Sequence, residues 1–105
     1  MAMPHCRPGE VARLAAIGDP AAKTVALART ASFEAIHLVV HAGQSIPAHR
    51  VAGSMTLYCI AGHVRFTGES PCELQAGDWL FLEPGASHAV QAIADSSLLL
   101  TILFD

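Results

Sequence analysis

The chain has 105 residues, of which 52% are hydrophobic and 14% charged, and its net charge is −3 with neutral histidines. This apolar composition excludes an intrinsically disordered protein. A negative chain without a run of Lys or Arg lacks the electrostatic signature of nucleic-acid binding, and no apolar stretch is long enough to span a membrane.

The N-terminal residues 1–10 contain three turn-forming residues and no apolar stretch typical of a signal peptide. We expect them to form a loose segment of a cytoplasmic protein. The three cysteines are odd in number and form no close pair, which agrees with a reducing compartment. The following segment, Glu10–Ile17, has a weak helical spacing of apolar residues, and both a helix and an edge strand are open for it.

Short apolar runs separated by Gly, Pro and Asp then continue to the C-terminus. They predict strands at Lys23–Thr30, Ser32–His41, Met55–Ala61, His63–Thr67, Cys72–Gln75, Trp79–Leu82, Ala86–Ile93 and Ser97–Phe104. Composition alone would also allow a helix at Ser32–His41, but its β-branched residues and the glycine that follows favour a strand. Many short strands with regular turns indicate an all-β sandwich or barrel. We see no repeat or linker and predict one domain over residues 1–105.

One segment has a regular arrangement of glycine and histidine. Five residues separate Gly43 from His49, Val51 stands two positions after His49, and Met55 comes four positions later. Six further residues lead to Gly62.

A second segment begins at Gly77 and repeats this kind of spacing. Five residues separate Gly77 from Glu83, Gly85 follows two positions later, and His88 stands three positions beyond Gly85. Ala92 comes four positions after His88.

These segments resemble the two sequence motifs of the cupin superfamily. The resemblance implies a double-stranded β-helix, or jelly-roll barrel, and often a homodimer. It also implies metal ligands at four positions, of which His49 and His88 carry histidine whereas Val51 and Met55 are apolar. The glycine framework is kept, but only half of the ligand set is present.

The resemblance and the alternation of side chains along a strand predict a pocket inside the barrel. If His49 points inward, alternation places Val51 on the same wall, and steps of two from Met55 add two further residues. The predicted lining is His49, Val51, Met55, Leu57, Cys59 and His88. By the same alternation, Tyr58 faces away from the pocket, toward a neighbouring sheet or a dimer partner.

A metal site would place His49 and His88 on a divalent transition metal such as Fe, Mn, Ni, Cu or Zn. A catalytic site of this kind generally uses three protein ligands, so a further donor is needed. His37, His41 and Cys59 are candidates for that donor, and Glu83 is a less favoured one. The alternative is that both histidines only form hydrogen bonds and bind no metal.

Three functions remain open at this point. The first is a cupin that binds a small organic molecule without a metal, with His49 and His88 as orienting groups. The second is a metal-dependent enzyme, such as a dioxygenase or isomerase, with an unusual ligand set. The third, which we rank lower because we see no DNA-binding segment, is a sensor domain like those of transcription regulators. The sequence does not decide whether the protein is an enzyme.

Overall fold

The computed structural model describes residues 6–16, 18–68 and 70–104, without the side chains of Ala48 and His49. Within these ranges the chain forms nine strands and no helix: β1 (Val25–Arg29), β2 (Phe33–Val40), β3 (Ser45–His49), β4 (Met55–Ala61), β5 (His63–Thr67), β6 (Cys72–Gln75), β7 (Trp79–Leu82), β8 (His88–Ala92) and β9 (Ser96–Leu103). Eight of them coincide with the predicted strands to within two residues at each end. No helix that could cross a membrane occurs in the described part of the chain.

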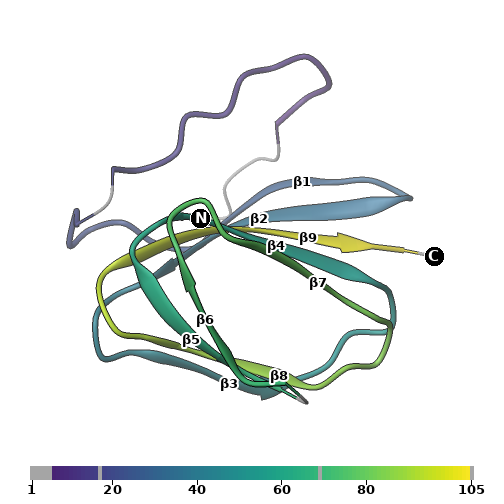
Figure 1. The fold of residues 1–105 in the computed structure, drawn as a ribbon. Coiled ribbons are helices and arrows are strands. Elements are labelled where there is room, and N and C mark those ends of the chain that lie inside the picture. Colours follow the sequence, from purple (N-terminus) through teal and green to yellow (C-terminus); the bar gives the residue numbers. More distant parts are fainter. Residues whose placement is uncertain (1–5, 17, 69, 105) are drawn as a thin grey trace.

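The strands form two antiparallel sheets, one in the order β1-β2-β9-β4-β7 and the other in the order β3-β8-β5-β6. Their pairing is nested, because β5 pairs with β6, β4 with β7, β3 with β8, and β2 with β9. A long hairpin that is folded over in this way is a jelly roll, so the predicted all-β fold is confirmed. Figure 1 shows the two layers, with β3 and β8 opposite β1, β2 and β9.

The strand β3 is the element that the sequence pattern did not predict. It is short, lies at the edge of its sheet and contains Pro47, which lacks the N–H group that a ladder requires. The register shifts between Ile46 and His49, which is the kind of position where a sheet tolerates proline. The strand ends at His49, and residues 50–54 form a loop. Strand alternation therefore does not extend to Val51, and its place on the wall of His49 stays a prediction.

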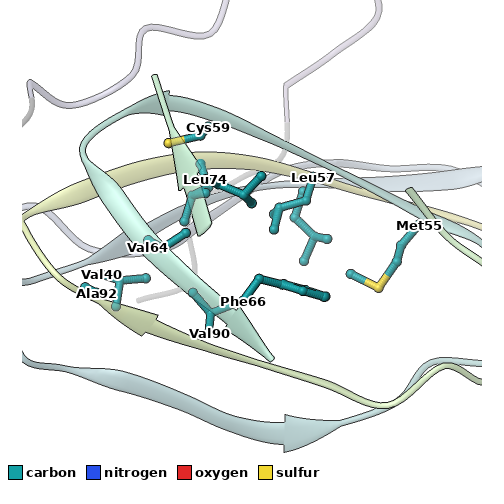
Figure 2. Close-up of a cluster of buried hydrophobic side chains, with 11 residues drawn as sticks. Val40, Met55, Leu57, Cys59, Val64, Phe66, Leu74, Val90 and Ala92 are labelled. Carbon is teal, nitrogen blue, oxygen red and sulfur yellow. The ribbon is translucent and has the colours of Figure 1, made fainter. Parts of the chain in front are cut away.

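The core lies between the two sheets and follows the alternation of side chains. Along β4, Met55, Leu57 and Cys59 are buried, and inward residues of β5, β6, β8 and β9 meet them. Figure 2 shows these side chains filling the space between the layers. A small barrel is filled by its own side chains, so little interior room remains for a ligand.

The segment Glu10–Ala16 forms neither the helix nor the edge strand that the sequence left open. Ile17 lies outside the described residues. It belongs to an N-terminal segment, residues 6–16, that arches over the outer side of β1 and β2 (Figure 1). The backbone N–H of Cys6 donates a hydrogen bond to the carbonyl oxygen of Leu27 at 2.8 Å. This contact ties the beginning of the segment to β1.

Candidate functional site

His88 opens β8 and is held from two sides. Its ring is 3% exposed, because residues 88, 90 and 92 of this strand all face inward. The ring stacks on Phe66 with a centroid distance of 5.9 Å and an interplanar angle of 9°. Its Nδ1 lies 3.3 Å from the carbonyl oxygen of Ala86. A carbonyl can only accept, so this contact assigns the hydrogen to Nδ1, and the lone pair of a neutral ring is then on Nε2.

His49 is brought to His88 by the strand register. The two residues are cross-strand Cα partners in the β3–β8 pair. The backbone therefore places both histidines that the sequence singled out at one point of the sheet. The side chain of His49 lies outside the described residues.

Two adjoining cavities lie at the rim of the barrel beside His88. The first has a volume of about 520 Å³ and is lined by Arg50, Thr67, Gly68, Gly85, Ala86, Ser87 and His88. The second, of about 650 Å³, shares residues 68 and 85–87 with the first and adds apolar side chains of β7. The N–H of Gly85 donates to the carbonyl oxygen of Val51 at 2.8 Å, which joins the two loops of this rim.

The other residues of the predicted pocket lie deeper than this rim. Met55, Leu57 and Cys59 do point inward from β4, but each is 2% exposed or less and packs within the core. Val51 lies in the loop after β3 and packs partly buried against the same core. These four residues line neither rim cavity. Their role in ligand binding stays a prediction.

The donors among the described side chains do not make up a three-ligand metal site. Val51 and Met55 offer no nitrogen or oxygen side-chain ligand, and no group of three or more His, Cys, Asp or Glu in the described residues could hold a metal ion. The Cys59 thiol is fully buried and lies 3.6 Å from the carbonyl oxygen of Ala61. Burial, and secondarily the charge of Asp78, raises the pKa of this thiol, which disfavours the thiolate that a metal requires.

The two histidines of the β2 region do not supply the missing donor either. His37 lies on the outer face of its sheet, where its Nε2 is 2.5 Å from Ser97 Oγ. His41 follows β2, with its Nε2 3.1 Å from the carbonyl oxygen of Ala22 and its Nδ1 4.0 Å from an oxygen of Asp95. The prediction that one of them turns inward was wrong, because each is held elsewhere. Glu83, the remaining candidate, is exposed.

Sequence reasoning missed Arg50, the positive charge of this rim. Arg50 directly follows His49, is exposed, and lines the cavity together with His88. The signal was present, because Arg50 and Arg65 are the two cationic residues between Gly43 and Ala92. Arg65 lies on β5 beside Glu73, at 3.6 Å, so Arg50 is the cation of the rim.

Comparisons with known proteins agree with this architecture. A family model described as "Cupin domain" matches residues 36–104. A conserved protein of unknown function from Streptococcus pyogenes aligns with 18% identity and a TM-score of 0.79, and the match covers 100% of this chain and 98% of that chain. A cupin superfamily protein from Desulfitobacterium hafniense aligns with 19% identity and a TM-score of 0.76, and the match covers 90% of this chain and 84% of that chain.

A DMSP lyase from Ruegeria pomeroyi has the same fold at 22% identity, with a TM-score of 0.69. The match covers 78% of this chain but only 46% of that chain. No curated protein sequence matches this chain. At these identities the structural likenesses support the fold alone.

Proposed function

Because the chain belongs to the cupin domain family, we propose that it binds a small organic acid at the rim of the barrel without a bound metal. The observation that carries this proposal is the rim cavity, which combines the guanidinium of Arg50 with the inward imidazole of His88. A site with a few polar groups beside apolar walls is typical of small-molecule binding.

The residue types at the rim favour a compact anionic ligand. Arginine presents a planar fork of donors that matches a carboxylate, and charge-assisted hydrogen bonds are stronger than neutral ones. The hydroxyl groups of Thr67 and Ser87 line the same cavity and could orient further oxygen atoms. Leu80 and Leu82 line the adjoining cavity and offer apolar contact. An organic acid of a few carbon atoms meets both requirements.

The exchange of Arg50 for Gln tests this proposal. We expect Arg50→Gln to raise the Kd for the best ligand about tenfold, since hydrogen bonds to charged groups contribute about 1.5–3 kcal/mol. The probes are pyruvate, malonate and citrate, each compared with its amide, titrated into ¹⁵N-labelled protein by NMR. The strongest shifts should occur at Gly68, Gly85 and Ser87.

The matched control is Arg65→Gln, which removes a positive charge from outside the rim. It should leave the Kd unchanged within about twofold. Equal effects of the two variants, or no binding of any probe, would contradict the proposal. It would also fail if protein purified without an affinity tag carried stoichiometric Fe, Mn, Ni, Cu or Zn that His49→Ala removes. That result would favour the metal-dependent enzyme instead.

We also propose that two copies associate through the outer faces of β4 and β7. Tyr58 and Trp79 are cross-strand partners there, and Phe81 lies two residues along β7. Their exposed fractions are 40%, 56% and 61%, which is unusual for large aromatic side chains in a monomer. Aromatic residues at the centre of an apolar patch are typical of homodimer interfaces.

The double variant Trp79→Ser/Phe81→Ser tests this interface. We expect it to weaken dimerisation by about 100-fold or more, because aromatic anchors contribute most of the binding energy of an interface. Sedimentation velocity over a concentration series would measure the change. Phe104→Ser is the control, since it removes an exposed aromatic ring from a different part of the surface. A wild-type protein that is monomeric at high micromolar concentration would exclude the dimer.

A further inference from the structure

A third cavity, of about 440 Å³, lies between the N-terminal segment and the outer side of β1 and β2. Apolar residues line it from both sides, among them Val11 and Leu14 of the segment, which are partly exposed, and Val25 and Leu27 of β1. The segment is held in this position by the hydrogen bond from the backbone N–H of Cys6 to the carbonyl oxygen of Leu27. Leu27 lies at the point where the β1–β2 register shifts. Figure 1 shows the segment on the side of the sheet that faces away from β3 and β8. This cavity is therefore separate from the rim site.

His37 lies at the base of this cavity and is the polar group that needs an explanation. Its side chain is 2% exposed, yet it is on the outer face of the sheet, where Val25 is its cross-strand partner. Its Nε2 bonds to Ser97 Oγ, while Nδ1 has no hydrogen-bond partner among the described residues. Every fully buried side-chain nitrogen or oxygen of the described residues has a hydrogen-bond partner. Because Nδ1 of His37 has none, it is not fully buried and faces the open space of the cavity.

The hydrogen-bonding state of the ring follows from its surroundings. Burial lowers the pKa of His37, so the imidazole is neutral at neutral pH. The Ser97 hydroxyl can donate to Nε2, which leaves the hydrogen on Nδ1. The Nδ1–H then faces the cavity as a donor that an acceptor atom of a ligand can reach.

The charged residues around the cavity favour an anionic acceptor. Lys23 and Arg13 line it against a single carboxylate, Glu10, whose Oε1 accepts from the Arg7 N–H at 3.1 Å. Lys23 stands two residues before Val25, the cross-strand partner of His37, in the connection that leads into β1. From Val25 to Leu27 the strand continues this lining for about 7 Å, at roughly 3.3 Å per residue. The lining thus has a cationic end and a long apolar side.

We propose that this cavity is a second binding site, which takes a linear apolar carboxylate of the fatty-acid type. The carboxylate accepts from the Nδ1–H of His37 and pairs with Lys23. The chain of the ligand lies along Val25 and Leu27, beneath Val11 and Leu14 of the N-terminal segment. This ligand differs from that of the rim site, which takes a compact acid beside Arg50.

Octanoate, titrated into the full-length protein by calorimetry and ¹⁵N NMR, is the probe for this site. We expect shifts at Val25, Leu27 and His37, and weaker binding of the uncharged analogue octanol. His37→Gln should raise the Kd for octanoate about tenfold, and Lys23→Gln about fivefold. The second variant changes an exposed residue, so it tests the site even if His37→Gln is unstable.

Two controls separate this site from surface charge and from the rim. Arg29→Gln removes a cation at the far end of β1, and Arg50→Gln removes the cation of the rim. Both should leave the octanoate Kd unchanged within about twofold. The proposal is overturned if octanoate does not bind, if His37→Gln and Lys23→Gln bind it like the wild type, or if Arg50→Gln abolishes its binding. The last outcome would assign octanoate to the rim and leave the rim proposal standing.

Discussion

Replacing Gly62 by Ala is expected to lower the free energy of unfolding by about 4 kcal/mol or more, a large part of the total of a small domain. Gly62 joins β4 to β5 with a φ of +97°, where a side chain costs about 1–2 kcal/mol. A Cβ atom at this position would clash with the carbonyl oxygen of Asp95 and would lie 2.6 Å from Cα of Ser96. Both contacts are with backbone, so neither can be relieved by a rotamer change.

The neighbourhood of Gly62 adds to this cost. The hydroxyl of Ser96 is 2% exposed and accepts a hydrogen bond from the N–H of His63 at 3.0 Å. A Cβ on Gly62 would lie 2.5 Å from that oxygen, so it would also displace the bond that joins β9 to the start of β5. A protein with Gly62→Ala should therefore be largely unfolded or strongly destabilised. Urea denaturation followed by far-UV circular dichroism would measure the effect.

Gly77→Ala separates the steric clash from the backbone strain. Gly77 has a φ of +93°, close to that of Gly62, but a Cβ at this position would meet no atom within 4 Å beyond its own chain neighbours. This variant should lose only about 1–2 kcal/mol, the cost of the left-handed conformation. Equal losses in the two variants would mean that the contact with Asp95 and Ser96 contributes nothing.

Most strands could be predicted because local pattern and tertiary burial agree in them. The inward residues of β4 and β8 alternate with outward ones, and glycines mark the connections. The strand β3 could not be found in this way, because Pro47 opposes a strand locally and the strand exists only through its pairing with β8. The conformation of Glu10–Ala16 depends on contacts with β1, which no periodicity encodes.

The sequence predicted the histidines of the site, but not which other residues line its cavity. The motif resemblance identified His88 and the inward direction of Met55, and strand alternation from Met55 gave that of Leu57 and Cys59. Alternation cannot distinguish an inward side chain that lines a cavity from one that fills the core, because this depends on the volume between the sheets. Arg50 was missed because it lies just beyond β3, where the direction of a side chain follows from the loop rather than from a period of two.

The half-present ligand set leads to a gain-of-function prediction. We expect Val51→His to raise the affinity for Zn²⁺ or Ni²⁺ by roughly 100-fold or more, because three imidazoles form a sufficient protein ligand set whereas two bind weakly. The register places His49 opposite His88, and the bond from Gly85 to the Val51 carbonyl holds this loop beside the turn that leads to His88. Calorimetric titration of the metal into tag-free protein would give the two affinities.

Two further variants decide whether a gained metal is bound at this site. Val51→Asn changes the polarity of the loop without adding an imidazole, so it should bind metal no better than the wild type. Val51→His/His88→Ala should lose the gain, because one of the three ligands is then absent. Equal affinities of the wild type and Val51→His would contradict the prediction. They would mean that the loop after β3 does not bring residue 51 close to both histidines.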